Sequence, residues 1–363
     1  FVQKLRRNVV TMAAADSSAV GSDVEITVLS FTGEQITVVS LPGDSTILEF
    51  KRKLTTCGHL VEEQQLSCGE VALNDDKKTL TKFGLEGKVT VTLVLKGLNV
   101  DRHIETLCAK GSMTEADAIN LLCAFGKEIF LNEPSLLELQ PPLVIAANLF
   151  GCAHQLNYIF DTFGEPPVSQ YLFLGNYVSR GCNSIDTFGL LLLYKKKYPQ
   201  KVHMLRGRQE CASISRIYGF YDECKRKFSV RTWKTFIEVF NSMPFCALIQ
   251  ERILCVPSGL SPYLQSIDQL RTIRRPDDVP DAGLICDLLW SYFDANVTFW
   301  VHSDKAVEWA FGPDVLEKFL DDNHLERIYC SSRIMEEGYE SLHGDRMVSF
   351  FSASNYCGEF HNK

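Results

Sequence analysis

The chain has 363 residues, of which 45% are hydrophobic and 23% are charged, a balance typical of a globular protein with two or three domains. Its formal net charge of −8 argues against binding to nucleic acid or to an anionic membrane through bulk charge. No apolar run reaches the roughly 18 residues that a membrane span needs.

The 13 cysteines lie between Cys57 and Cys357, and none forms a C-x-x-C pair. This pattern argues against a disulfide framework or a zinc module and favours a reducing compartment, the cytoplasm or the nucleus. We predict a disordered N-terminal extension over residues 1–22, because Met12 is followed by a low-complexity stretch. Residues 1–11 either precede a true start at Met12 or are the remnant of a targeting peptide, so organelle targeting stays open.

Residues 23–97 carry the pattern of a small domain with β-strands and one helix. Two alternating strands flank a turn at Gly33, a helix follows with apolar residues at helical spacing, and VTVTLVL (89–95) is a closing strand. This ββαβ order predicts a small α+β domain of the β-grasp type. The segment also resembles the ubiquitin-like family, and the matching residues are Thr32-Gly33, Pro42, Asp44, Lys51, Lys53, Gln64-Gln65-Leu66, Thr79-Leu80 and LVLKG (93–97).

The resemblance implies an integral docking domain, because the chain continues past Gly97 where the family has a processed diglycine tail. The family's apolar interaction patch corresponds to Phe31, Leu66 and Val94, and such a patch would bind receptors of the ubiquitin pathway. The alternative is a domain that only adds bulk.

Residues 98–363 predict a larger α/β domain. Two helices are expected between Asp101 and Leu139, and Pro141-Pro142 ends them. Short apolar strands at 143–147, 171–175 and 203–207 then alternate with helices at 154–163 and 184–199. Strands and helices in this order predict a layered α/β architecture with functional groups in the loops that follow the strands.

These loops read NLFG (148–151), GNYVSRG (175–181) and GRQE (207–210). Their spacing resembles the metallophosphoesterase signature G-D-x-H-G, G-D-x-V-D-R-G and G-N-H-E. Residues 210–228, 260–291 and 351–360 are similar to the type-1 Ser/Thr protein phosphatases. The resemblance covers roughly residues 100–363 and implies an α/β metallophosphoesterase-type β-sandwich flanked by helices.

The family binds two divalent metals (Mn, Fe or Zn) with carboxylates and imidazoles. All six ligand positions differ in this chain, where they are Asn148, Phe150, Asn176, Arg208, Pro257 and Ser332. Phe and Pro offer no ligand atom, and Arg208 places a permanent cation among the ligands. We therefore expect no metal cofactor. The general-acid histidine is replaced by Gln209 and its orienting aspartate by Ser179.

Several cations remain where the family binds phosphate. Arg180 and Arg275 match the two arginines that hold phosphate oxygens, and Arg206 also belongs to the family motif. Together with Arg208 and Tyr356 they form a candidate site for a phosphate or another anion, which would bind without hydrolysis. In the alternative interpretation these arginines fill the collapsed metal cavity and pair with Glu210 and other carboxylates.

The sequence therefore predicts a pseudophosphatase, a non-catalytic scaffold or regulatory subunit. Its partners would be other proteins: phosphoproteins, phosphatase regulatory subunits or ubiquitin-pathway receptors. The first alternative is an active Ser/Thr protein phosphatase with an atypical metal site. A cysteine nucleophile at Cys152, Cys211 or Cys255 is disfavoured, because none lies in a phosphate-binding loop. A purely structural subunit also stays open. The family's partner groove needs strands beyond residue 363, so we expect a C-terminally incomplete domain.

Overall fold

The structure is a computed structural model that describes residues 23–30, 33, 35–57, 61, 64–95, 99–110, 112–179, 183–302 and 308–362. The chain divides into two compact units, residues 1–98 and 99–363, and each is described by itself. No helix among the described residues combines the length and the apolar character that crossing a bilayer requires.

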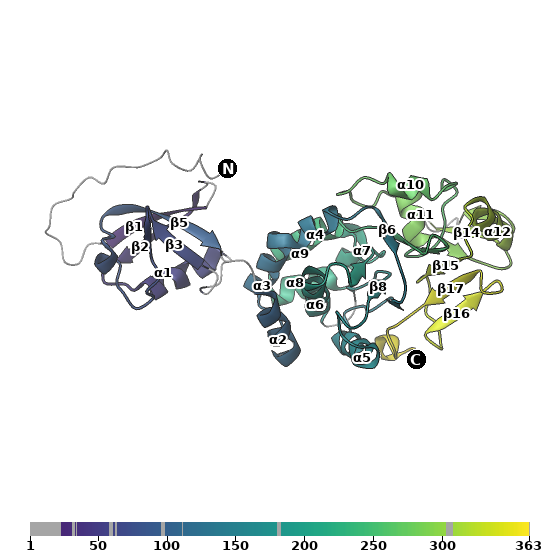
Figure 1. The fold of residues 1–363 in the computed structure, drawn as a ribbon, viewed down its shortest axis with the longest axis horizontal. Coiled ribbons are helices and arrows are strands. Elements are labelled where there is room, and N and C mark those ends of the chain that lie inside the picture. Colours follow the sequence, from purple (N-terminus) through teal and green to yellow (C-terminus); the bar gives the residue numbers. More distant parts are fainter. Residues whose placement is uncertain are drawn as a thin grey trace. The chain divides into compact units, whose positions relative to one another are not determined.

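The first unit is a five-stranded sheet with one helix packed on it (Figure 1). The strand order is β2-β1-β5-β3-β4, with β1 and β5 parallel. Apolar side chains alternate along β1, so that Val24, Ile26 and Val28 face the core, where they meet Phe50 and Leu54 of α1. This is the arrangement of a small β-grasp domain. The elements are β1 (Asp23–Ser30), β2 (Gln35–Pro42), α1 (Ile47–Leu54), β3 (Gln64–Cys68), β4 (Val71–Ala72) and β5 (Lys88–Leu95).

The expected apolar patch of this unit needs a correction at Leu66. Its side chain is only 2% exposed and belongs to the core between the sheet and α1. Leu66 therefore stabilises the fold and does not contribute to an exposed interaction patch. Phe31 lies outside the described residues, as does the side chain of Val94.

The second unit is built on two sheets that pack face to face. One sheet has three parallel strands, in the order β7-β8-β9. The other has six strands, in the order β16-β17-β15-β11-β10-β6. Apolar residues from both sheets, among them Leu172 and Ala247, form the core between them. The sandwich strands are β6 (Leu136–Leu139), β7 (Val144–Ala146), β8 (Tyr171–Phe173), β9 (Val202–Met204), β10 (Cys246–Ile249), β11 (Ile253–Cys255), β15 (Arg327–Cys330), β16 (Tyr339–Leu342) and β17 (Met347–Phe350).

Helices cover both outer faces of the sandwich, as expected for a metallophosphoesterase fold. α6 is buried along almost its whole length, and α11 and α12 pack on the core of the six-stranded sheet. The helices are α2 (Val100–Lys110), α3 (Glu115–Leu121), α4 (Lys127–Leu131), α5 (Ala153–Phe163), α6 (Ser184–Lys197), α7 (Ala212–Ile217), α8 (Phe220–Lys227), α9 (Val230–Phe240), α10 (Asp268–Arg271), α11 (Leu284–Trp290) and α12 (Pro313–Asp322).

Residues 136–139 were expected to continue a helix, and this prediction is wrong. They form β6, which pairs in parallel with β10. The run SLLEL follows Pro134 and is short and apolar, so its pattern alone does not distinguish a buried strand from a helix.

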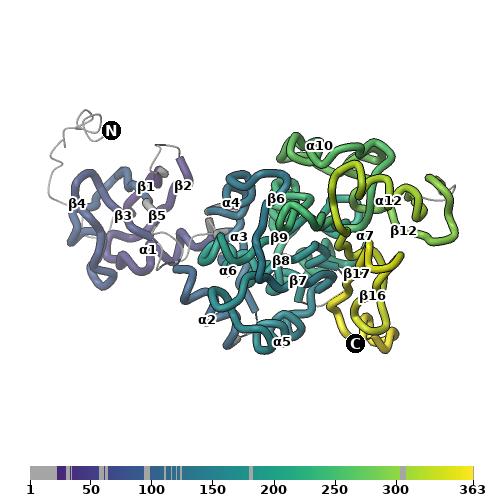
Figure 2. The backbone as a smooth tube through the Cα atoms, turned by 45° about the vertical axis from the view of Figure 1, so that its right-hand side comes forward, coloured from purple at the N-terminus to yellow at the C-terminus, as the bar shows by residue number. Residues whose placement is uncertain are grey.

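A third, smaller sheet lies at the same end of this unit as α12, as Figures 1 and 2 both show. Its strands are β12 (Tyr292–Phe293), β13 (Trp300–His302) and β14 (Trp309–Phe311), in the order β12-β14-β13. Among the described residues, β13 is therefore an edge strand.

Candidate functional site

The parallel strands β7, β8 and β9 end at one edge of their sheet, where the loops that follow them meet. The loops approach each other closely at Gly175 and Gly207. Gly175 has a φ of +104°, and a Cβ on it would lie 2.5 Å from the Cα of Gly207. Glycine is thus required for the loops to converge. We call the six positions that match metal ligands the loop centre: Asn148, Phe150, Asn176, Arg208, Pro257 and Ser332.

The fully buried carboxylate of Glu210 ties two of these loops together. Its Oε2 accepts hydrogen bonds from the backbone N–H groups of Asn176 (2.8 Å) and Gly207 (3.0 Å). Its Oε1 accepts from those of Tyr177 (2.8 Å) and Val178 (3.2 Å). Burial raises the pKa of Glu210 to about 7, although the four N–H groups oppose this shift. Sequence reasoning treated Glu210 only as a possible ion-pair partner, whereas it positions the loops.

Two side-chain amides form a hydrogen-bonded pair in the loop centre. Nδ2 of Asn176 donates to Oδ1 of Asn148 at 2.6 Å, and Oδ1 of Asn176 accepts from the backbone N–H of Gln209 at 3.1 Å. Nδ2 of Asn148 donates to the carbonyl oxygens of Ser331 and Phe350. Both asparagines have positive φ, 60° and 61°, a conformation that asparagine tolerates well. The two amides therefore direct their polar atoms at the protein itself.

Phe150, at a position that matches a family ligand by sequence resemblance, lies in an apolar cluster. Its ring centroid lies 4.7 Å from that of Tyr356 and 5.7 Å from that of Phe351, and Met335 and Ala353 complete the cluster. The side chain is 3% exposed although its φ is +46°, which is unusual for a bulky residue. The packing of the two neighbouring rings holds this backbone conformation in place.

Arg208 brings a cation to the loop centre. Its guanidinium lies 5.6 Å from the centroid of the Trp290 ring. Burial lowers the pKa of Arg208, and the carboxylate of Glu308 opposes this shift. Beside it, Gln209 is 7% exposed, and its buried Oε1 has no hydrogen-bond partner among the residues that the structure describes. An amide at this position has no titratable proton to give to a leaving group.

The remaining positions serve structural contacts. The carbonyl oxygen of Pro257 accepts a hydrogen bond from the hydroxyl of Ser331 at 2.8 Å, and Ser332 is half-buried next to it. Ser179, at the orienting position, donates through its hydroxyl to the carbonyl oxygen of Tyr218 at 3.3 Å. The first contact joins the loops that follow β11 and β15, and the second joins the loop after β8 to the end of α7.

The donor set of the loop centre does not fit two divalent cations. Holding two such ions close together requires anionic carboxylates, one of them bridging, and neutral imidazoles. The loop centre offers two neutral amides, a hydroxyl and a guanidinium. Within the described ranges, no group of three or more His, Cys, Asp or Glu side chains is placed to hold a metal ion.

Arg206 was expected to bind an anion, and the structure corrects this. Its side chain is fully buried, and all three guanidinium nitrogens donate internally. Nε donates to the carbonyl oxygen of Glu210, Nη1 to that of Asp277 and Nη2 to Oδ1 of Asn241, at 2.7–2.8 Å. A ligand anion would have to displace these bonds, so Arg206 is a structural residue.

Arg275 requires the same correction. Its Nε donates to the hydroxyl of Ser135 at 3.0 Å, and Nη1 donates to the carbonyl oxygens of Phe130 (3.0 Å) and Ser242 (2.7 Å). Its Nη2 donates to the carbonyl oxygen of Glu133. Arg275 therefore joins segments that are far apart in the sequence. The anion site expected from sequence loses two of its cations.

The other candidates for anion binding are placed as follows. Arg180 lies outside the described residues. Tyr356 is half-buried, its ring packs on Phe150, and its backbone N–H donates to Oδ1 of Asn362 at 3.0 Å. Among the described arginines of the expected anion site, Arg206 and Arg275 donate to backbone carbonyl oxygens and Arg208 does not.

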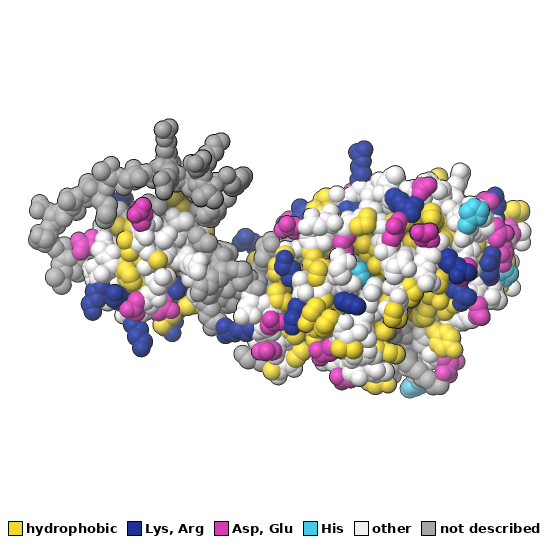
Figure 3. All heavy atoms as spheres, viewed as in Figure 1, with side chains coloured by type: hydrophobic (Ala, Val, Ile, Leu, Met, Phe, Trp, Pro, Cys, Tyr) yellow, Lys and Arg dark blue, Asp and Glu magenta, His cyan; other side chains and the backbone are white. Residues whose placement is uncertain are grey.

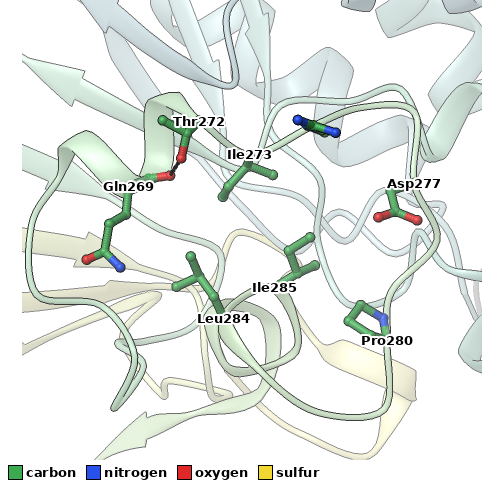
Figure 4. Close-up of a pocket in the computed structure, with 8 residues that line it drawn as sticks. Gln269, Thr272, Ile273, Asp277, Pro280, Leu284 and Ile285 are labelled. Atoms are coloured by element: carbon green, nitrogen blue, oxygen red, sulfur yellow. Dashed lines mark hydrogen bonds between the residues drawn. The ribbon is translucent and has the colours of Figure 1, made fainter.

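Two pockets lie elsewhere, and neither contains a residue of the loop centre. A pocket of about 370 Å³ lies beside α10 and α11; in Figure 4, Ile273, Leu284 and Ile285 form its apolar part and Asp277 lies at one side. A larger pocket of about 740 Å³ lies against α12. Sequence reasoning identified neither. Charged side chains of both signs alternate with apolar ones on the face of the unit seen in Figure 3.

Comparisons with known proteins agree with this fold. The solved structure of a protein serine/threonine phosphatase from Saccharomyces cerevisiae, described as similar to human phosphatase PP5, superposes with a TM-score of 0.67 and 28% sequence identity. The match covers 72% of this chain and 86% of that chain. The family model of the calcineurin-like phosphoesterases matches residues 141–331, which is more than half of the 363 residues. The chain therefore belongs to the calcineurin-like phosphoesterase family.

Proposed function

We propose that this chain is a pseudophosphatase, a non-catalytic protein-binding scaffold or regulatory subunit built on the phosphoesterase fold. One observation carries the proposal: Asn148 and Asn176 hydrogen-bond directly to each other at 2.6 Å where the family places metal ligands. A hydrolytic centre needs a charged, metal-loaded pocket at this point. The neutral amide pair, together with Phe150 and Arg208, supports a centre that is closed by internal contacts.

The proposal predicts the result of a metal and turnover assay. The purified full chain is expected to bind well below one equivalent of metal by elemental analysis and to leave p-nitrophenyl phosphate intact with added Mn²⁺. An active type-1 phosphatase serves as the positive control. Two bound equivalents, together with turnover that Asn176→Ala removes, would favour the alternative, an active Ser/Thr phosphatase with an atypical metal site.

Phosphate binding without hydrolysis is a second candidate function, and Arg208 favours it. The guanidinium of Arg208 packs on the ring of Trp290, and the carboxylate of Glu308 is the main negative charge that acts on it. Calorimetry with inorganic phosphate tests this idea by comparing the wild type with Arg208→Gln. Heat of binding that disappears in the variant supports it, and the absence of heat for both proteins rejects it.

The β-grasp unit is proposed to be a ubiquitin-like docking domain, and the partners are proposed to be phosphoproteins, phosphatase regulatory subunits or ubiquitin-pathway receptors in the cytoplasm or the nucleus. The sequence resemblance and the strand order support this part of the proposal. A pull-down with and without residues 24–97 tests it, because partners of the docking domain are lost only from the shortened chain. Identical partner sets would reject a docking role.

A further inference from the structure

The larger pocket of the second unit is a groove with mixed apolar and acidic lining. Its volume of about 740 Å³ is in the range of sites that bind small molecules or peptide side chains. Several of its lining residues belong to α12, which lies with the small sheet at one end of the unit (Figures 1 and 2). We call it the α12 groove; its lining is Leu260, Ser261, Pro262, Leu264, Gln265, Phe299, Trp300, Asp314, Val315, Lys318, Phe319 and Asp322.

The α12 groove has a rigid apolar floor and an exposed aromatic rim. Leu260, Leu264 and Phe319 are nearly fully buried and belong to the core under the six-stranded sheet. Phe299, in contrast, is 68% exposed, and Trp300 beside it is half-buried. Apolar side chains that are accessible beside the exposed ring of Phe299 form a patch that a binding partner can cover.

The backbone at Phe299 is held in a conformation that bulky residues seldom adopt. Its φ is +59°, and its N–H donates to both carboxylate oxygens of Asp314, at 3.1 and 3.0 Å. A residue in the left-handed region stays there only when its surroundings determine it, and such residues gather at binding sites. The exposed ring packs little against its own chain, so this conformation presents the ring outward.

The charge of the α12 groove determines which partner fits it. Lys318 is paired with Asp322 at 2.6 Å, so these two charges compensate each other. Asp314 forms no ion pair with any Lys or Arg of the described residues. A carboxylate beside an exposed aromatic ring attracts a cation, which can lie over the ring face and against the negative charge.

The strand beside the α12 groove offers backbone groups as well. β13 begins at Trp300 and is an edge strand, and Val301 on it is 50% exposed. An extended peptide can pair with such an edge while its side chains enter the pocket next to it. We propose that the α12 groove binds an extended segment of a partner protein that carries an apolar side chain next to a Lys or Arg. No residue is shared with the loop centre, so this site is independent of whether the chain hydrolyses phosphate.

The test uses random decapeptides displayed on phage as the probe and the full-length chain as the target. Selection is expected to enrich sequences with an apolar residue next to a Lys or Arg. Enriched peptides are then synthesised and measured by fluorescence anisotropy. A selection without enrichment, or one that yields acidic or uncharged sequences, overturns the proposal.

Three variants locate the binding. Phe299→Gly suits the left-handed backbone, keeps the fold and is expected to weaken binding at least tenfold. Asp314→Asn keeps an acceptor for the N–H of Phe299 but removes the negative charge. We expect it to lower the affinity for the peptide roughly threefold to tenfold, and this loss of affinity should shrink at high salt. Tyr158→Ala on α5 is the control, because its ring is similarly exposed at 64%. Binding that survives both groove variants, or that Tyr158→Ala weakens equally, overturns the proposal.

Discussion

Replacing Glu210 with glutamine, Glu210→Gln, changes the one side chain that holds the β8 and β9 loops through four backbone N–H groups. At pH 5 the protonated carboxyl group still offers acceptor lone pairs on both of its oxygens, whereas a glutamine side chain has a single acceptor oxygen. In the variant, two of these N–H groups would therefore face an NH₂ group. Each buried donor that loses its acceptor costs about 1–2 kcal/mol. At pH 5 we expect Glu210→Gln to lower the free energy of unfolding by about 2–4 kcal/mol.

The loss depends on pH, and its sign follows from the direction of the pKa shift. Burial raises the pKa of Glu210 from 4.5 to about 7 in the folded state. Between these values the folded chain keeps a proton that the unfolded chain has released, so the stability contributed by Glu210 falls as the pH rises. At 1.36 kcal/mol per pKa unit, the shift from 4.5 to about 7 corresponds to a change in the free energy of unfolding of about 3 kcal/mol across this pH range. The wild type and the variant are therefore expected to differ much less at pH 8 than at pH 5.

Urea unfolding followed by tryptophan fluorescence is the assay, because all four tryptophans lie in the second unit: Trp233, Trp290, Trp300 and Trp309. Glu138→Gln is the control, since this carboxylate is 60% exposed and the ion pair with Arg271 that it loses lies at the surface, so a small change in stability is expected. If Glu210→Gln lowers the free energy of unfolding equally at pH 5 and pH 8, the reasoning is refuted, because Glu210 then does not change its protonation state in the folded chain between these two pH values.

Three further substitutions test the packing. Lys195→Met leaves Glu133, whose side chain is 18% exposed, without its partner at 2.6 Å, and we expect a loss of about 3 kcal/mol in urea unfolding, part of which Glu133→Gln restores. Phe150→Ala opens the aromatic cluster and is expected to cost about 3 kcal/mol; a loss below about 1 kcal/mol would show that the cluster is not packed. Arg206→Lys removes most of three buried hydrogen bonds, so it should lower stability by about 2–4 kcal/mol and leave phosphate affinity unchanged in calorimetry. Reduced phosphate affinity in a folded Arg206→Lys protein would contradict its structural role.

The short apolar runs were sufficient to predict the layered fold. β7, β8 and β9 lie inside or within one residue of their expected ranges, and α5 and α6 follow where helical spacing placed them. The failure at 136–139 has a physical cause, because a run of four residues with three apolar side chains satisfies the helical and the extended pattern equally well. Only the pairing of β6 with β10, about 110 residues further on, decides between them.

The candidate site was predictable as a set of loops but not as a set of contacts. The motif spacing placed Asn148, Asn176 and Arg208 together, since parallel strands end at one edge. The family resemblance also suggested Arg275 as a phosphate ligand, which its hydrogen bonds contradict. Those partners come from elements that are remote in sequence, so no local pattern indicates them. The same is true of Phe299 and Asp314, whose contact spans 15 residues and a chain reversal.

The amide pair of Asn148 and Asn176 has a consequence for how this protein responds to its surroundings. In a metal-dependent relative the geometry of these loops is coupled to the supply of divalent ions. Here the amide pair, the carboxyl group of Glu210 and backbone groups hold the loops. Under the proposed metal-free function, the shape of these loops would be independent of metal supply, and a chelator that removes Mn²⁺ or Zn²⁺ would leave it unchanged. Partners that recognise these loops would then bind equally well in metal-poor and metal-rich conditions.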